Sequence, residues 1–161
     1  MTFTLTSADF RDGDILPDAH VKALGDTSPQ LSWSGAPEGA KSFAVTCYDP
    51  DAPTGSGFWH WTVANIPDDV TELGAGAGAV GGANLPQGAV QGRTDYGEAG
   101  SGGAAPPPGH GPHRYIFTVF AVDVDRLDVT SDNSGAVFGF NLHFHTLAKA
   151  SITATYENTG A

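Results

Sequence analysis

The segment SFAVTCYDPDAPTGSGFWHWTVANIP, residues 42–67, contains two apolar runs separated by a short loop. The runs 42–49 and 58–67 are apolar at both odd and even positions, which predicts strands covered on both faces. The prolines and glycines between them favour turns. The segment therefore predicts two buried neighbouring strands, with acidic residues at the end of the first and a histidine near the start of the second.

The rest of the chain adds strands, loops and one helix. Strands are predicted at 3–7, 28–35, 113–123 and 151–158. Loops rich in Gly, Pro or Asp are predicted at 8–30, 68–93 and 95–112. The one good helix candidate is 137–151, where apolar residues recur every three to four positions at Phe140, Phe144 and Leu147. This spacing predicts that these three side chains face the core.

The pattern as a whole predicts a mainly β fold with one or two short helices, the main one near the C-terminus. No internal repeat or linker divides the chain, so a single domain is expected over residues 1–161. Cys47 is the only cysteine, which excludes an intrachain disulfide, and its apolar surroundings predict an inert core residue.

Charge and composition exclude several function classes. The net charge is −11, from 18 acidic and 7 basic residues, which argues against nucleic acid and anionic membranes as partners. No apolar run approaches the ~18 residues of a membrane span. The N-terminal sequence MTFTLTSADFRDGD lacks the features of a signal peptide, so a cytoplasmic location is expected.

Polar side chains gather at the predicted strand ends. Pro50 and Pro53 force extended geometry on the residues before them, so Asp49 and Asp51 are expected to point the same way. On the next strand, strict alternation places His60 with Phe58 and Thr62, and places Trp59, Trp61 and Val63 on the other face.

The strongest strand brings a similar set of groups. His113 and Tyr115 share a face with Phe117, while Arg114 points the opposite way and is expected to form a structural ion pair. If the three strands are neighbours, two carboxylates, two imidazoles and a phenol converge beside loops rich in Gly and Pro. Loops held by a rigid scaffold commonly form binding sites.

Three blocks in order carry a family resemblance: DPDAP at 49–53, HW at 60–61 and GPHRY at 111–115. Together with PPPGHGPHRYIFTVFAVD and HFHTLAKASITATY, they resemble the phosphatidylethanolamine-binding protein family, also called Raf kinase inhibitor-like proteins. The resemblance covers about residues 3–157 and points to the bacterial and archaeal branch.

The resemblance implies an antiparallel β-sheet domain with a small anion pocket. The ligand-binding residues that it implies are Asp49, Asp51, Pro53, His60, Gly102, Pro107, His113 and Tyr115. The loop GSGGAAPPPG departs from the family's usual spacing, and Ala105 stands where many bacterial relatives carry a cysteine, so a redox role of that cysteine is absent.

The implied function is non-catalytic binding of a small anionic or phosphorylated ligand. A kinase or protease partner and a homodimer are also implied, whereas no cofactor or metal is expected. We expect the carboxylates to orient the imidazoles, and Tyr115 and the backbone N–H groups around Gly102 to donate to the ligand. This hypothesis predicts tighter binding as pH falls, and the family picture makes Ala52–Pro53 a candidate cis bond.

Each of these residues also has a simpler interpretation. Asp49 and Asp51 could cap a turn, His60 and His113 could be structural histidines, and Tyr115 could be a core residue. His143 and His145 lie two apart on the predicted helix and cannot chelate one metal together. His20 and His110 are expected to be exposed loop residues.

Two other function classes stay open from the sequence. The first is a hydrolase or metal-dependent enzyme that uses the Asp/His cluster, although HExxH, GxSxG and CxxC signatures are missing. The second is a structural or interaction module without a ligand.

Overall fold

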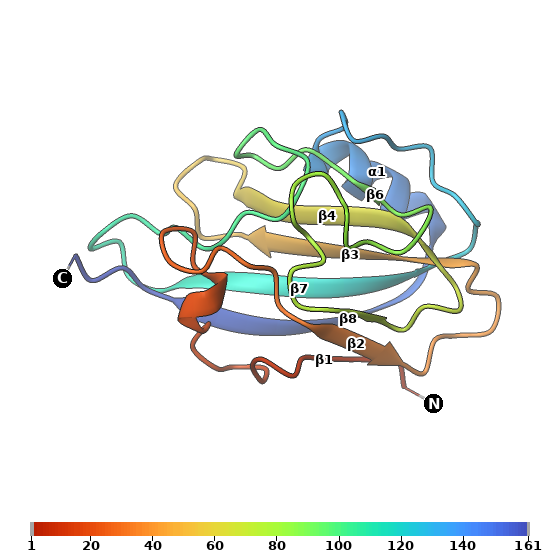
Figure 1. Cartoon of the computed structure of the whole chain (residues 1–161), viewed down its shortest axis with the longest axis horizontal. Helices are drawn as coiled ribbons and strands as arrows, with labels where there is room; N and C mark the ends of the chain where they lie inside the picture. Colours follow the sequence, from red (N-terminus) through yellow and green to blue (C-terminus); the bar gives the residue numbers. More distant parts are fainter. Residues whose placement is uncertain (1, 161) are drawn as a thin grey trace.

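The computed structural model describes residues 2–160 and has two antiparallel sheets with one α-helix near the C-terminus (Figure 1). The five-stranded sheet has the order β6-β4-β3-β7-β8 and the three-stranded sheet the order β1-β2-β5. The strands are β1 (Thr4–Thr6), β2 (Leu31–Ser34), β3 (Ser42–Asp49), β4 (Phe58–Pro67), β5 (Glu72–Leu73), β6 (Val90–Gln91), β7 (His113–Val122) and β8 (Thr146–Tyr156). The helices are the 3-10 turn η1 (Asp18–His20) and α1 (Gly135–His145). The prediction of a mainly β fold with a late helix is confirmed.

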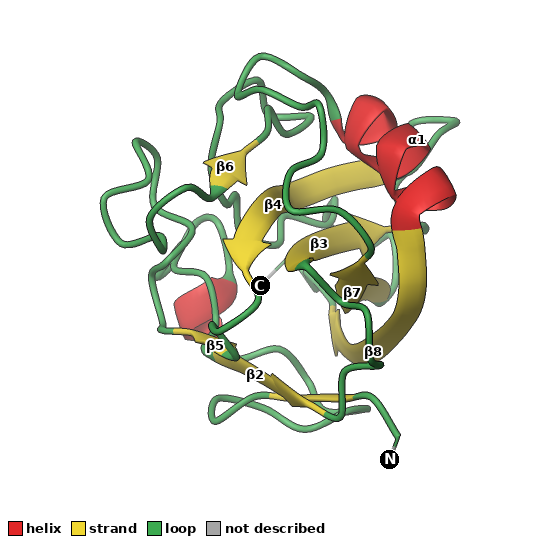
Figure 2. Cartoon of the chain, turned by 90° about the vertical axis from the view of Figure 1, so that its right-hand side faces the viewer, coloured by secondary structure: helices red, strands yellow, loops and turns green. Residues whose placement is uncertain are grey.

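The five-stranded sheet is the middle layer of the molecule. The three-stranded sheet lies against one of its faces and α1 against the other (Figure 2). A large apolar cluster that includes Leu31, Trp61 and Phe117 fills the space between the sheets. A smaller cluster around Phe138 and Leu142 lies beneath α1. Because β3 is central, it is buried on both faces, as its sequence predicts.

A β-bulge in β4 changes the direction of the side chains that follow it. Tyr48 pairs with Trp59, but the next residue back along β3, Cys47, pairs with Trp61, so His60 is the extra residue. His60 and Trp61 therefore both face the three-stranded sheet, where they line one cavity with Cys47, whereas Trp59 packs against Gly135 of α1. The predicted separation of His60 from Trp61 is wrong, because strict alternation does not hold across a bulge.

The helix is shorter than predicted. Ser134 caps it, with its side chain accepting from the backbone N–H of Val137, and it ends at His145 instead of residue 151. The chain then enters β8 at once, and Thr146 pairs with Val122. The final strand therefore starts five residues before its predicted position, because pairing with β7 along its whole length outweighs the helical pattern of 146–151.

The predicted core side of the helix is also wrong. Phe140, Phe144 and Leu147 are 67%, 64% and 46% exposed, while Phe138 is fully buried and Leu142 nearly so. The helix sequence GAVFGFNLHFH is apolar around most of its circumference, so periodicity allows either side to face inward. The close approach of the Phe138 ring to Gly92, where an added Cβ would lie 2.4 Å from it, favours the other side.

Two further sequence predictions concern single residues. Cys47 is buried, and burial together with the charge of Asp49 raises the pKa of its thiol, so it is the inert core residue that was expected. His20, in contrast, is not an exposed loop residue. It is buried, with Nδ1 2.7 Å from the carbonyl oxygen of Thr27, because η1 folds it under the loop 26–29.

Neither helix in residues 2–160 has the length and apolar character needed to cross a membrane.

Candidate ligand-binding site

The strand order brings the three predicted segments together. β3 lies between β4 and β7, so the end of β3 meets the start of β4 and of β7 at one end of the sheet. A cavity of about 220 Å³ opens there. Its walls are Asp49, Ala52, Pro53, Thr54, Phe58, His60, Tyr96, Ala105, Pro107, His113 and Tyr115. Six of the eight predicted site residues line it, and the two that do not are Asp51 and Gly102.

Asp49 and His113 form a buried pair at the base of the site. Asp49 is 2% and His113 1% exposed, and Oδ2 of Asp49 lies 2.7 Å from Nδ1 of His113. The other carboxylate oxygen accepts from the backbone N–H of Asp51 at 2.7 Å. Since an ionised carboxylate can only accept, Nδ1 of His113 carries the proton and Nε2 is directed away from Asp49. This is the orienting role that the sequence hypothesis gives to a carboxylate.

His60 is held in a different way. Its Nδ1 lies 3.0 Å from the carbonyl oxygen of Gly102, so Nδ1 donates and Nε2 is the ring nitrogen left for the cavity. Burial lowers the pKa of this imidazole, which keeps it neutral near physiological pH. The bulge of β4 lets His60 and Trp61 face the same side, whereas regular alternation would direct one of the two toward α1.

Tyr115 brings a buried hydroxyl without a partner. The residue is 1% exposed, and within residues 2–160 its oxygen makes no hydrogen bond, although the backbone of Ala105 lies nearby. Burial, and then the negative charge of Asp49, raise the pKa of the phenol, so it stays protonated and can donate.

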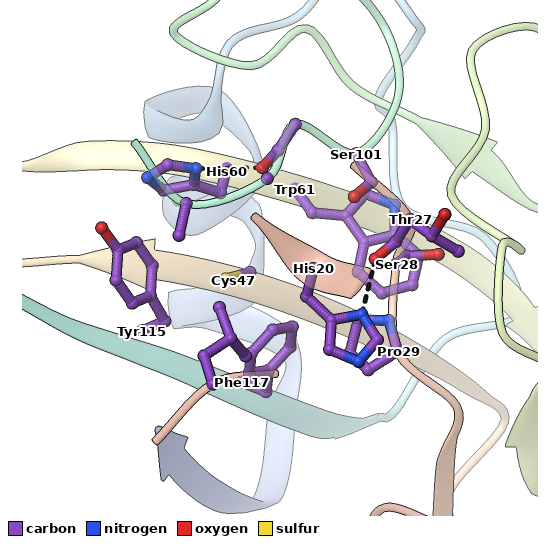
Figure 3. A pocket seen from close by; sticks show the side chains of 14 residues that line it. His20, Thr27, Ser28, Pro29, Cys47, His60, Trp61, Ser101, Tyr115 and Phe117 are labelled. Carbon is purple, nitrogen blue, oxygen red and sulfur yellow. Dashed lines mark hydrogen bonds between the residues drawn. The ribbon is translucent and has the colours of Figure 1, made fainter. Parts of the chain in front are cut away.

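A second, much smaller cavity lies behind the site. It measures about 20 Å³, room for about one water molecule, and is walled by His20, Cys47 and Trp61 among others. His60 and Tyr115 line both cavities, so they stand between them. Figure 3 shows the two side chains in the lining of the smaller cavity. The hydroxyl of Tyr115 points to the side on which the ring of His60 lies.

An aromatic wall completes the cavity, and part of it was not predicted. The ring of Tyr96 contacts Phe58 and His60 edge-on, with centroids 4.7 and 5.5 Å apart. Its hydroxyl donates to the carbonyl of Gly103 at 2.8 Å, and burial raises its pKa to about 12. Tyr96 is the one aromatic residue in the segment 68–112, which is the signal that could have identified it.

Asp51 lies outside the cavity, contrary to the sequence prediction. β3 ends at Asp49 and a turn follows, so Asp51 does not continue the strand. Its carboxylate binds Arg114 through two parallel contacts, Nε to Oδ2 at 3.0 Å and Nη2 to Oδ1 at 2.9 Å. The expected ion pair of Arg114 is thereby confirmed. The pair ties the exit loop of β3 to β7, and hydrogen bonding by Arg114 lowers the pKa of Asp51 to about 2.

Replacing Arg114 by alanine is expected to raise the pKa of Asp51 toward its ordinary value of 3.8, because the side-chain hydrogen bonds and the charge of Arg114 are lost while the backbone N–H of residue 114 still donates. In the unsubstituted protein Asp51 stabilises the fold above its unfolded pKa, and this contribution is lost as pH falls toward about 2. The variant should lack that part of the acid dependence. An NMR titration of the Asp51 carboxyl carbon measures the change, with Arg126→Ala as control. An unchanged midpoint in Arg114→Ala would contradict the assignment.

The glycine backbone does not supply the expected donors. The N–H of Gly102 donates to the carbonyl of His60 at 2.9 Å, and that of Gly103 donates to Asp26 at 2.8 Å. Gly102 instead makes room for the aromatic wall, since a Cβ there would lie 2.3 Å from the ring of Tyr96.

The prediction of a cis peptide bond at Ala52–Pro53 is also wrong. No cis peptide occurs within the described residues, so Ala52–Pro53 is trans.

His110 is the second residue that the sequence reasoning missed. It is exposed, as expected, but its Nδ1 lies 2.7 Å from Nε2 of His113. His145, on α1, pairs instead with Asp123 at 2.9 Å, and His143 is exposed. Across residues 2–160, no three His, Cys, Asp or Glu side chains are arranged to hold a metal ion.

Comparisons with known proteins agree with the sequence resemblance. A family model described as phosphatidylethanolamine-binding protein matches residues 6–157. YbhB of Escherichia coli (strain K12) is 55% identical over 160 residues, which cover 95% of this chain and 99% of YbhB. The crystal structure of Escherichia coli YbcL superimposes with a TM-score of 0.96 at 52% identity, covering 98% of this chain and 99% of that one. CT736 from Chlamydia trachomatis has a TM-score of 0.83 at 31% identity, with 98% of each chain covered.

Proposed function

Since the chain belongs to the phosphatidylethanolamine-binding protein family, we propose that it is a non-catalytic binding protein for small phosphoryl and other anionic groups. The ligand occupies the cavity between the ends of β3, β4 and β7. There it meets His60, His113 and Tyr115, while Asp49 holds His113 from behind. Pro53 and Pro107 form part of the rim.

The observation that carries the proposal is the hydroxyl of Tyr115. Burying a hydroxyl without a partner costs about 1–3 kcal/mol, and proteins rarely leave one unmatched. Here the unmatched donor lines a cavity that also receives two imidazoles. A ligand oxygen that accepts from Tyr115 recovers this cost, and an anionic oxygen makes the stronger bond.

The charge of the cavity makes binding depend on protons. Asp49 is buried, no Lys or Arg within residues 2–160 lines the cavity, and Arg114 is paired with Asp51 outside it. Among the side chains that line the cavity, favourable charge for an anion therefore comes only from imidazoles, which ordinarily become protonated around pH 6.5.

Anion affinity is expected to rise as pH falls from about 8 to about 6, by up to about tenfold per pH unit for each proton taken up. Calorimetry with phosphate and, separately, with sulfate measures this. Sulfate does not titrate in the range, so its pH dependence reports on the protein alone. An affinity that is flat or increases with pH would contradict the proposal.

Replacing Tyr115 by phenylalanine separates ligand binding from stability. Phosphate affinity should fall by about tenfold or more, the loss of one hydrogen bond to a charged group, whereas the free energy of unfolding should stay equal or rise because an unmatched hydroxyl is removed. Tyr48→Phe is the matched control, because that hydroxyl donates to Ser56 outside the cavity. It should lose about 1 kcal/mol of stability and bind phosphate normally. Wild-type affinity in Tyr115→Phe would contradict the role given to this hydroxyl.

A hydrolase is the second candidate, favoured by one observation. The Asp49–His113 pair has the geometry of a general base, with the carboxylate on Nδ1 and Nε2 directed away. Turnover of a phosphate monoester that is lost in His113→Ala would favour this candidate over binding alone. The kinase or protease partner and the homodimer stay predictions from the family resemblance.

A further inference from the structure

The side chain of His110 contacts the ring nitrogen of His113 that a ligand in the cavity would need. Nδ1 of His113 donates to Asp49, so Nε2 is the one ring nitrogen of His113 that can contact a ligand. Nδ1 of His110 lies 2.7 Å from this Nε2. We infer that His110 is a displaceable cap on His113, and that a ligand oxygen takes its place when it binds. This inference rests on the proposed function.

The local sequence explains why His110 reaches back over His113. The backbone N–H of His110 donates to the carbonyl of Pro107 at 3.2 Å, which closes a turn with Pro108 and Gly109 at its centre. Gly109 has φ of 74°, the conformation that the third position of a type II turn requires, and Pro suits the second. The PPGH sequence thus forms a turn whose last residue lies over the site.

His110 can leave without disturbing the core. It is exposed, and its contact to His113 is its one side-chain hydrogen bond within residues 2–160. It is followed by Gly111, another residue with positive φ, at 86°. His113, in contrast, is buried and fixed by Asp49. Of the two rings, His110 is therefore the one that moves.

The cap closes only when the nitrogens of His110 and His113 that face each other carry one proton between them. The contact needs one proton between the two nitrogens, so it forms when either ring is neutral. When both rings are charged, two N–H groups face each other and the contact breaks. The other titratable groups lining the cavity are Asp49 from β3, His60 from β4, Tyr115 from β7 and Tyr96 from the loop before β7. Of these only His60 also titrates as an imidazole, and burial disfavours its charged form.

The cap makes a specific prediction for phosphate binding. At about pH 8, His110→Ala should bind phosphate about three- to tenfold more tightly than wild type, because the ligand no longer competes with a hydrogen bond. His110→Asn should stay within about twofold of wild type, since its amide N–H can still reach Nε2 without titrating.

Calorimetric titration with inorganic phosphate at that one pH measures these affinities. His143→Ala, which removes an exposed histidine from α1, is the control and should match wild type. Equal or weaker phosphate binding by His110→Ala at about pH 8 overturns the cap and leaves the proposed function standing. Equal tightening in the alanine and asparagine variants also overturns it, because the gain would then come from loop mobility. Absence of phosphate binding in every protein overturns the proposed function and the cap together.

Discussion

Replacing His113 by alanine is expected to lower the free energy of unfolding by about 3–5 kcal/mol near neutral pH. Asp49 is 2% exposed, and His113 is the one side chain that binds its carboxylate within residues 2–160. Without the imidazole, a buried negative charge keeps only the backbone N–H of Asp51 as a partner. Phosphate binding should be lost as well, because the variant lacks the ring nitrogen that faces the ligand.

Urea unfolding near pH 7 and calorimetry with phosphate measure the two effects, with His143→Ala as the control. Asp49→Asn combined with His113→Ala removes the buried charge and should recover part of the stability without restoring phosphate binding. A stability loss below about 1 kcal/mol would show that the pair does not hold the site together.

Replacing Phe138 by alanine should cost about 3–5 kcal/mol, whereas the same change at Phe140 should cost less than about 0.5 kcal/mol. The two residues lie two apart on α1, but Phe138 is fully buried in the cluster beneath the helix and Phe140 is 67% exposed. Both variants replace a phenylalanine of α1 by alanine. The difference between their free energies of unfolding therefore shows which side of α1 faces the sheet.

Chemical denaturation of both variants at one pH provides the measurement. Circular dichroism of the folded proteins checks that α1 is retained. If Phe140→Ala were the more destabilising variant, the face predicted from the spacing of Phe140, Phe144 and Leu147 would be the correct one after all, and the orientation of α1 described above would be wrong.

The outcome at the site shows what sequence periodicity can predict. The strands 42–49, 58–67 and 113–123 were predictable because long apolar runs bounded by turn residues leave little choice. The meeting of Asp49, His60, His113 and Tyr115 followed from the resemblance, and the strand order β4-β3-β7 brings it about.

The errors have physical causes that lie outside local pattern. Asp51 was misplaced because an arginine far along the chain binds it once the strand has ended. The N–H groups of Gly102 and Gly103 were misassigned because partners in distant segments already occupy them. His110 and Tyr96 were missed because a loop residue shows its contacts only after the turn geometry is known.

The extra residue of β4 has a consequence for how this site tolerates changes in chain length. With Trp61 kept opposite Cys47, deleting Phe58 or Trp59 would restore an uninterrupted two-residue repeat and turn the imidazole of His60 to the opposite side of the sheet, toward α1. Loops such as 79–89 can gain or lose residues without that penalty. Ligand binding at this site thus depends on the number of residues in β4 as much as on which residues they are.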